Sequence, residues 1–432
     1  MRKHLIFALT LLLALCILCA CGDKTTNTDT PGETTFVSKY TAEGSIQEIK
    51  DKLSWEGINS FPIKTANMDI SEARKLCVDF FRYAKTARWI PDTYYPIYEK
   101  GKPATPDEQP KRNLDEGIVY GGLPYISFGT GNVYRLMDYM DESNGVVNME
   151  DAGANPLLFG NQCANGSYVG WARVINSAPL IPTSNITEIN DFLRLGNYTY
   201  PNTLQEYNAD YGTDEICRNN GENTMFESYA LLKAGDGIVY FTSAGHVVMI
   251  SQDAVVVKND DGTINADESY VLVIDQTPGW EKATAESGDF YTYQRNVDAK
   301  WTFRDLYKGN YLPFTFKEWT GEDPIEETEV KFSHTGDTIT ESLLFSGKVT
   351  SNYYIFDIYA QIFDSKGNEV FKIASRTNRS HAKELKFYRA GETVEMWGSL
   401  EKLKEDETYT VKIYAQLGTG ERPTLWEGTL TQ

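Results

Sequence analysis

The last hundred residues of the chain carry the pattern that most constrains its fold. Short runs there alternate between apolar and polar residues, as in YYIFDIYAQIF and TYTVKIYAQL, and the segments SKGN, RAGE and KEDE separate them. A period of two residues places successive side chains on opposite faces of a strand, and such spacing is typical of two packed antiparallel sheets. The sequence therefore predicts an Ig-like β-sandwich over residues 331–432. This part has no cysteine, which favours a spacer or a binding module over a catalytic domain.

The region before the sandwich combines helical and strand patterns. Apolar residues recur at helical spacing around Cys77, and residues 45–90 and 160–176 are predicted to be helical, with Ser71 and Glu72 at a capped start. An irregular insertion is expected to follow, up to about residue 230. The runs GIVYF, HVVMI, AVVV and SYVLVI then predict strands.

This pattern predicts an α+β domain over residues 45–320. The acidic stretch GEDPIEETE follows it, and we expect residues 321–330 to form a linker to the sandwich.

The N-terminus has the features of a lipoprotein signal. Two basic residues precede an apolar run that ends in LCAC and a glycine. Small Ala20 fits the signal peptidase, and Cys21 would become the lipid-bearing first residue of the mature chain. The run is shorter than the roughly 20 residues that span a bilayer. We expect a signal peptide over residues 1–20, a flexible tether over residues 21–44, and an extracytoplasmic protein anchored by lipid to a bacterial membrane.

The charge of the chain restricts its partners. It contains 41 basic and 61 acidic residues, for a formal net charge of −20 at pH 7. Such a surface repels phosphate backbones at long range, so a nucleic-acid partner is not expected.

Three cysteines remain once the signal and the lipid attachment are set aside. They are Cys77, Cys163 and Cys217, an odd number, so at least one thiol has no intrachain disulfide partner. Cys77 lies on an apolar helix face and is predicted to be buried. A bridge between Cys77 and Cys217 stays open at this point.

Cys163 is the candidate nucleophile, although a small apolar core residue is the alternative. A thiolate attacks better than a thiol, so a catalytic cysteine needs a helix N-terminus or an imidazolium beside it. Cys163 opens the predicted helix in GNQCANGSYVGW. Gln162 could donate an amide N–H to an oxyanion together with the Cys163 backbone N–H. His246 is the one histidine of the predicted catalytic domain, because the others lie in the signal or the sandwich.

These residues resemble the CHAP family of cysteine, histidine-dependent amidohydrolases and peptidases, which shares a papain-like core with NlpC-type wall peptidases. Gln162-Cys163 opens a helix, Gly235-Asp236 leads into Gly245-His246-Val247-Val248, and Ile274-Asp275-Gln276 closes another strand, within about residues 160–280. The resemblance implies a helix packed on an antiparallel sheet.

By the same resemblance, Cys163 would be the nucleophile and His246 the general base, and Asp275 would orient the histidine, with Gln276 as the fallback. The family has glutamate where Asp275 stands and asparagine where Thr277 stands.

The order of the strands decides whether Asp275 can reach His246. In a three-strand meander the two would lie near 15 Å apart, at about 3.3 Å per residue. If the strand that begins at His246 instead pairs directly with the strand that ends at Asp275, they lie opposite each other. The resemblance favours direct pairing, with residues 252–269 as a protruding hairpin.

Two further patterns suggest ligand sites. Trp89, Tyr94 and Tyr95 could line an aromatic cleft for a glycan or a peptide, although packing into the core is the commoner role of such residues. The run NDDGTINADE has part of the spacing of a calcium loop, but Val257 occupies its first ligand position, so a turn is favoured. No cofactor and no metal site are predicted.

The function indicated by these features is a surface cysteine amidase or peptidase that cleaves amide bonds, most readily those of cell-wall peptidoglycan peptides. A transglutaminase-like thiol enzyme would share the Cys, His, Asp order. A non-catalytic surface lipoprotein that binds glycan or peptide, through the sandwich as well, is the alternative from another class.

Overall fold

The computed structural model describes residues 54–96, 98–99, 102–103, 113–176, 192–199, 212–241, 245–277, 281–282, 291–292, 297–333, 347–376, 382–386, 393–398, 403–404 and 407–431. They form a mixed α+β structure with several antiparallel sheets. The described residues divide into two compact units. Unit 1 lies within residues 181–273 and 298–315, and unit 2 lies within residues 38–180, 274–297 and 316–432.

Unit 1 is built on a six-stranded sheet in the order β15-β12-β11-β10-β16-β9. The strands are β9 (Phe192–Arg194), β10 (Gly237–Phe241), β11 (Gly245–Val255), β12 (Tyr270–Ile274), β15 (Val297–Thr302) and β16 (Leu312–Phe316). Two helices accompany it, α9 (Thr213–Tyr229) and α10 (Phe303–Lys308). β12 is a hydrogen-bonded neighbour of β11, so the predicted adjacency of these strands is confirmed and the meander is wrong. β11 continues to Val255, so the hairpin predicted over residues 252–269 begins later than expected, and the register that would set His246 opposite Asp275 stays a prediction.

Helix α9 lies where the sequence predicted an irregular insertion, and that prediction was wrong for residues 213–229. Its sequence contains glycine and several asparagine and threonine residues, which are weak helix formers. Gly221, with φ +76°, interrupts the helical backbone. Buried side chains, among them Ile216, Met225 and Tyr229, hold the helix in place. Tertiary packing therefore outweighs local propensity here.

The first part of unit 2 consists of short helices and short strands. The helices are α3 (Trp55–Asn59), α4 (Ile70–Thr86), α5 (Val133–Asp138), α6 (Met149–Ala154), α7 (Pro156–Phe159), α8 (Cys163–Trp171) and α11 (Lys317–Thr320). One sheet has the order β13-β14-β6-β1-β8-β7. It comprises β1 (Arg88–Pro91), β6 (Tyr120–Gly121), β7 (Met140–Asp141), β8 (Val146–Val147), β13 (Glu281–Lys282) and β14 (Tyr291–Thr292). This part of unit 2 also contains two separate strand pairs, β2 (Tyr95–Pro96) with β5 (Asn113–Leu114) and β3 (Tyr98–Glu99) with β4 (Lys102–Pro103).

The predicted helix ends need correction. The cap of α4 is Asp69, whose carboxylate accepts from the N–H groups of Ser71 and Glu72, and not Ser71 itself. The helix ends at Thr86, because the chain then enters β1. Helix α8 ends at Trp171, before the predicted residue 176. The burial of Cys77 on α4 is confirmed, and its thiol donates to the Trp171 carbonyl at 3.8 Å.

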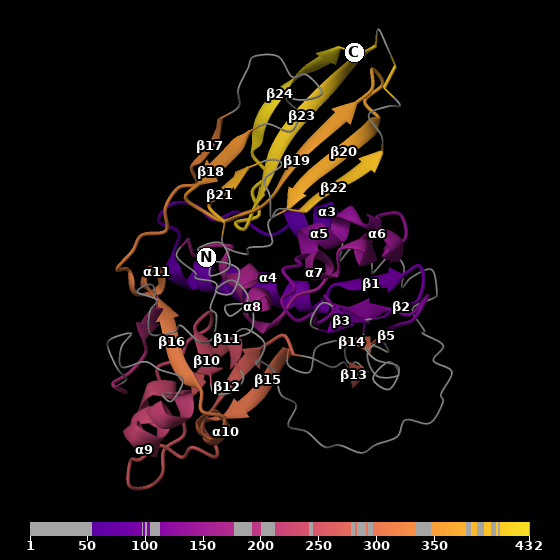
Figure 1. Cartoon of the computed structure of the whole chain (residues 1–432). Coiled ribbons are helices and arrows are strands. Elements are labelled where there is room, and N and C mark those ends of the chain that lie inside the picture. The colour runs from indigo at the N-terminus through magenta and orange to yellow at the C-terminus, as the bar shows by residue number, and fades with distance from the viewer. Residues whose placement is uncertain are drawn as a thin grey trace, which may run out of the picture. The chain divides into compact units, whose positions relative to one another are not determined.

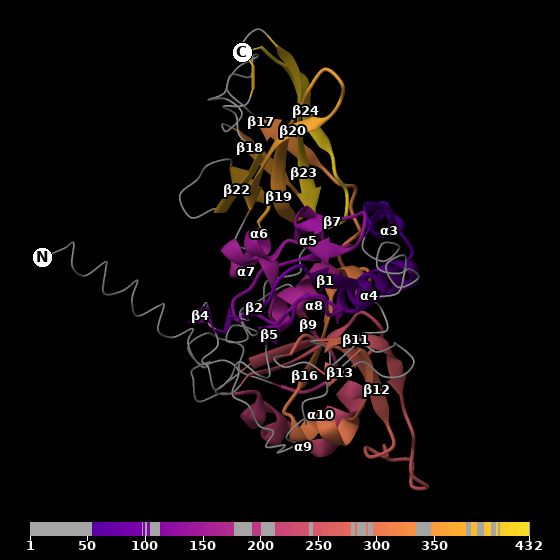
Figure 2. The same cartoon turned by 90° about the vertical axis from the view of Figure 1, so that its right-hand side faces the viewer.

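The C-terminal part of unit 2 contains two antiparallel sheets (Figures 1 and 2). The three-stranded sheet comprises β17 (Val330–Ser333), β18 (Lys348–Ser351) and β21 (Glu384–Lys386). The five-stranded sheet has the order β22-β20-β19-β23-β24, with β19 (Ile355–Phe363), β20 (Glu369–Arg376), β22 (Thr393–Gly398), β23 (Thr408–Leu417) and β24 (Thr424–Thr431). Val349 and Leu385 of the smaller sheet share one apolar core with Ile358, Ile373 and Ile413 of the larger.

The acidic segment at residues 321–330 is bound to its surroundings on both sides. Ile325 is buried, and its carbonyl accepts from the N–H of Asn67 at 2.9 Å. The Glu326 carbonyl accepts from Lys64 Nζ at 2.6 Å and from the Tyr353 hydroxyl at 3.1 Å. These contacts tie the segment to the start of the chain's folded part and to the sandwich, all within unit 2.

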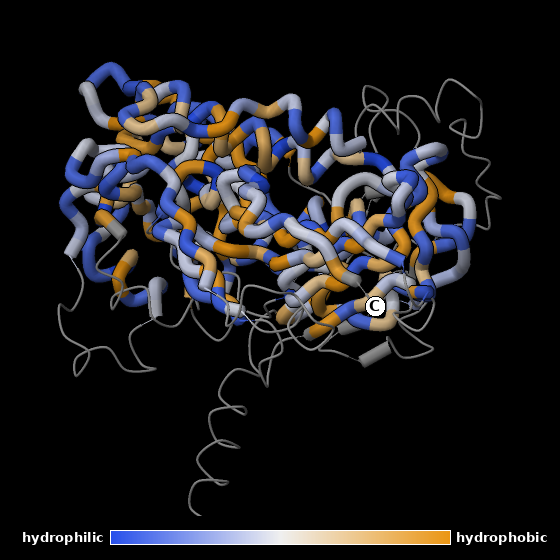
Figure 3. The backbone as a smooth tube through the Cα atoms, turned by 90° about the horizontal axis from the view of Figure 1, so that it is seen from above, coloured by the Kyte–Doolittle hydropathy of each residue, from blue (hydrophilic) through white to orange (hydrophobic). Residues whose placement is uncertain are grey.

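Hydrophobic and hydrophilic residues alternate along much of the backbone tube (Figure 3). Among the residues that the structure describes, no helix combines the length and the apolar character needed to cross a membrane.

Candidate functional site

Cys163 is the first residue of α8, as the sequence predicted. Gln162 precedes it as the N-cap in extended conformation, with φ −110° and ψ 177°, and does not cap the helix with its side chain. The backbone N–H groups of a first helical turn have no partner within the helix, and they carry the positive end of its dipole. This field lowers the pKa of a thiol placed there. The Cys163 side chain is largely buried, with 6% of the residue exposed.

A loop at residues 126–131 lies along the start of α8. The Phe128 N–H donates to Gln162 Oε1 at 3.3 Å, and Asn165 Nδ2 on the helix donates to the Gly129 carbonyl. Gly129 has no room for a side chain, because a Cβ would lie 2.3 Å from the Gly160 carbonyl oxygen. Loop 126–131 is therefore fixed on both sides of the cysteine.

Gln162 was predicted to help bind an oxyanion. Its carbonyl oxygen accepts the Phe128 N–H, which leaves the Nε2 donor end outside that hydrogen bond. This orientation is compatible with donation from Nε2, the role that the sequence suggested.

Asp275 and Gln276 follow β12 and are buried in unit 2. Gln276 Nε2 donates to the Leu123 carbonyl at 3.0 Å, so its amide holds the segment that leads into loop 126–131. A Cβ on Gly166 of α8 would lie 3.1 Å from the Gln276 Cβ. Gln276 thus packs against α8 at Gly166, where the missing side chain lets it approach closely.

Lys85 on α4 is a buried cation that the sequence reading missed. Only 3% of it is exposed, and its Nζ makes no hydrogen bond within the described part of the chain. Burial lowers the pKa of Lys85 to about 7, and the negative charge of Asp275 limits the drop. The signal was present, because Lys85 follows Phe81 by four residues and so shares its apolar helix face.

His246 begins β11 in unit 1. It lies opposite Tyr240 of β10, the two rings are 6.2 Å apart between centroids, and 9% of the histidine is exposed. Cys163, Asp275 and their neighbours belong to unit 2. The pairing of Cys163 in unit 2 with His246 in unit 1 stays a prediction.

The Gly235-Asp236 pair of the resemblance forms a structural corner before β10. Gly235 has φ +84°, in the region that favours glycine. The Asp236 side chain is buried, accepts from the Lys233 N–H at 2.8 Å, and accepts from the Thr315 hydroxyl at 2.5 Å. These bonds fix the start of β10 next to β16.

The aromatic residues proposed for a cleft are mostly core residues. Trp89 is fully buried and its Nε1 donates to the Gly122 carbonyl at 2.9 Å, while Tyr95 is 5% exposed. The ring of Phe159 meets both edge-on. Their burial corrects the cleft interpretation for Trp89 and Tyr95, because apolar packing consumes the ring surfaces. Tyr94 stays available, with half of its surface exposed.

Within the described part of the chain, Cys77, Cys163 and Cys217 are buried and form no disulfide, so the bridge between Cys77 and Cys217 is not formed. Burial raises the pKa of the Cys217 thiol to about 12 and that of Cys77 still further. Neither is suited to act as a thiolate near neutral pH.

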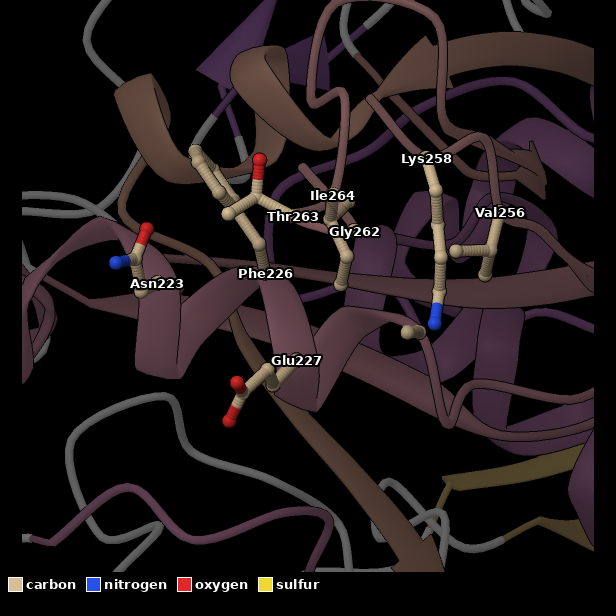
Figure 4. Close-up of a pocket in the computed structure, with 9 residues that line it drawn as sticks. Asn223, Phe226, Glu227, Val256, Lys258, Gly262, Thr263 and Ile264 are labelled. Atoms are coloured by element: carbon tan, nitrogen blue, oxygen red, sulfur yellow. The ribbon is translucent and has the colours of Figure 1, made fainter. Parts of the chain in front are cut away.

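A pocket of about 300 Å³ lies in unit 1 between α9 and the hairpin after β11 (Figure 4). Phe226 of α9 faces Thr263 and Ile264 of the hairpin there. The hairpin includes the stretch with partial calcium-loop spacing, and Asp261 Oδ1 accepts from the Thr263 N–H at 3.0 Å, as in a turn. None of the predicted site residues lines this pocket.

Cys21, the predicted lipid attachment residue, lies outside the described residues. Comparisons of the chain with protein-family models, with characterised proteins and with solved structures each found no match.

Proposed function

We propose that this protein is a surface-anchored cysteine amidase or peptidase that hydrolyses amide bonds, with peptidoglycan peptides as its substrate class. The observation that carries the proposal is the position of Cys163 at the first residue of α8, after an N-cap that does not cap the helix with its side chain. A thiol in this position is in the field that favours its thiolate.

In the proposed reaction, Cys163 Sγ attacks the amide carbonyl carbon and His246 takes the thiol proton. The histidine returns that proton to the leaving amine, and water then hydrolyses the thioester. Asp275 orients the histidine, and Gln162 Nε2 donates to the oxyanion with the Cys163 N–H. Asp275 directly follows β12, which is a neighbour in the sheet of the strand that begins at His246, and its role requires a register in which the two residues lie opposite each other. A papain-like core, with α8 packed on the sheet, is part of this proposal.

The proposed substrate follows from the proposed location. The signal sequence and the lipid anchor at Cys21 would place the folded part on a tether outside the membrane, where wall peptides are the abundant amides. The acidic surface is compatible with a peptide substrate and unfavourable for nucleic acid.

The alkylation rate of Cys163 against pH tests the proposal in the lipid-free protein, with each cysteine followed by peptide mass. We expect Cys163 to react with a midpoint well below the value of about 8.5 for a free thiol, and His246→Ala to raise that midpoint. Cys77 and Cys217 serve as unreactive internal references, because burial raises the pKa of both thiols. A wild-type Cys163 that is inert, or that reacts identically in both proteins, contradicts the proposal.

A second candidate is a non-catalytic lipoprotein that binds glycan or peptide. The burial of Cys163 favours it, because a binding protein needs no accessible thiol. Tyr94 is its exposed aromatic residue in the stretch proposed as a cleft. Binding of a muropeptide by both wild type and Cys163→Ala, with no turnover by either, would support this function.

A further inference from the structure

One arginine side chain connects the C-terminal sandwich to loop 126–131. Arg135 on α5 donates from Nε to the Asp357 carboxylate on β19 at 3.0 and 3.2 Å, and from Nη2 to the Phe356 carbonyl at 3.1 Å. From Nη1 it donates to the carbonyl and hydroxyl oxygens of Thr130, at 3.0 and 3.1 Å. A single guanidinium thus binds a sandwich strand and the loop.

The loop passes this constraint to the start of α8. The Thr130 N–H donates to the Leu157 carbonyl at 2.6 Å, and the Gly131 N–H donates to the Gly160 carbonyl at 2.8 Å. Phe128 lies two residues before Thr130, and its N–H donates to Gln162 Oε1. The residue that Arg135 holds is therefore close along the chain to the residue that contacts the N-cap of α8.

The ion pair that anchors this connection is sealed from water. The side chains of Arg135 and Asp357 are 2% and 0% exposed and lie 222 positions apart in the sequence. Asp357 is also paired with Arg376 at 3.3 Å. A buried pair of this kind is costly to break, because removal of Asp357 takes the paired carboxylate from a guanidinium that is shielded from water. The position of Thr130 is accordingly set by the folded sandwich.

The conformation of Phe128 shows that the loop needs such support. Its φ is +65°, a region that bulky side chains rarely adopt. Backbone strain of this kind persists only where the surrounding contacts determine the conformation. The hydrogen bonds of Phe128, Gly129 and Thr130 supply those contacts.

We propose that Arg135 and Asp357 are positioning residues of the Cys163 site, and that the sandwich serves this site by fixing loop 126–131 against the start of α8. The inference rests on the proposed function, since it requires a reactive Cys163. On this inference the sandwich is a structural part of the thiol site, whereas the sequence suggested a separate spacer or binding module.

The test is the pH midpoint of Cys163 alkylation in two pairs of variants of the full lipid-free chain. Thr130→Val removes the hydroxyl acceptor of Arg135 and keeps the shape of the side chain, whereas Thr130→Ser keeps the hydroxyl. We expect Thr130→Val to raise the midpoint and to slow alkylation at pH 7 by about 2- to 10-fold, the factor for one hydrogen bond. Thr130→Ser should retain the wild-type midpoint.

Asp357→Asn tests the sandwich end of the connection, and Glu395→Gln is its matched control. Glu395 is also a buried carboxylate of the five-stranded sheet, paired with Arg376 and bonded to Tyr139, but it makes no hydrogen bond to loop 126–131 within the described residues. We expect both variants to lower the unfolding temperature and only Asp357→Asn to move the Cys163 midpoint toward that of a free thiol.

Three results overturn the inference alone: equal midpoints in Thr130→Val and wild type, equal midpoints in Thr130→Val and Thr130→Ser, or equal shifts in Asp357→Asn and Glu395→Gln. If Asp357→Asn does not fold, the Thr130 pair decides. A wild-type midpoint at the free-thiol value overturns the proposed function, and the inference with it.

Discussion

Unit 2 contains two buried polar regions that differ in how their charges are satisfied. Where α5 meets the sandwich, Arg376 forms ion pairs with Asp138, Asp357 and Glu395. In the last turn of α4, Lys85 is as deeply buried, yet its Nζ makes no hydrogen bond within the described residues. The first region is a network of paired charges, and the second is a cation near one acidic residue.

The difference indicates different roles for the two regions. A network in which cations and carboxylates alternate can specify one docking geometry, because any other arrangement leaves a buried charge uncompensated. A buried polar group without a hydrogen-bond partner lowers stability, so its presence calls for an explanation other than stability. The second region lies on α4, which packs against the helix that carries the proposed nucleophile, and perturbed groups gather at functional sites.

Loss of Arg376 should have the largest effect on stability. We expect Arg376→Met to lower the free energy of unfolding by about 3–5 kcal/mol, because buried carboxylates lose their partner. Urea unfolding measures this. The pH dependence of this loss provides a check. Burial opposes the ionisation of Asp138, but the positive charges of Arg376 and Lys372 outweigh burial and hold the pKa of Asp138 below its ordinary value of 3.8. Its stabilising contribution is present above that value and is lost as pH falls through the lowered pKa, so the deficit of the variant should shrink in acid.

Lys85→Met should have a smaller effect, and one that depends on pH. The folded-state pKa is about 7 and the unfolded value is 10.5, so between them the unfolded chain binds more protons and wild-type stability rises with pH. The variant lacks this group. Its stability relative to wild type should therefore be highest below pH 7 and decline toward pH 10, by at most about 1.4 kcal/mol per pH unit.

Urea unfolding of both proteins at pH 6, 7.5 and 9 measures that decline, and Lys75→Met on the exposed face of α4 is the control. A difference that does not change with pH would contradict the contrast between the regions, because Lys85 would then keep an ordinary pKa in the folded protein.

The strands of the sandwich could be predicted from sequence because their signal is local. The alternating runs became β19 and β23. Ile358 and Ile362 of β19 face the shared apolar core, and Tyr359 between them is buried in a separate cluster, as the two-residue period of a strand requires. Helix α9 was missed because its residues are weak helix formers and buried contacts hold it. The acidic segment was predicted to be a linker from composition, but Ile325 and the Glu326 carbonyl bind residues more than 250 positions earlier. Composition carries no information about such partners.

In the candidate site too, features with a local sequence pattern could be predicted and contacts between distant residues could not. The place of Cys163 at a helix start could be predicted, because the helical spacing of the following residues is a local pattern. The Arg135–Asp357 pair could not, since its members lie 222 positions apart and each is an ordinary charged residue in its own segment. Lys85 could have been suspected from the apolar helix face that it shares with Phe81.

The smallest expected effect concerns an ion pair of the sandwich that is exposed to water. Lys348 and Glu384 pair at 3.2 Å between β18 and β21, with 41% and 45% of their side chains exposed. Water screens such a pair, so Lys348→Met should change the free energy of unfolding by at most about 1 kcal/mol, and less in high salt. The same urea titration measures it beside Arg376→Met. A cost for Lys348→Met equal to that of Arg376→Met would show that pairing alone, without burial, determines the stability of the sandwich, and the distinction between the two buried regions would lose its physical basis.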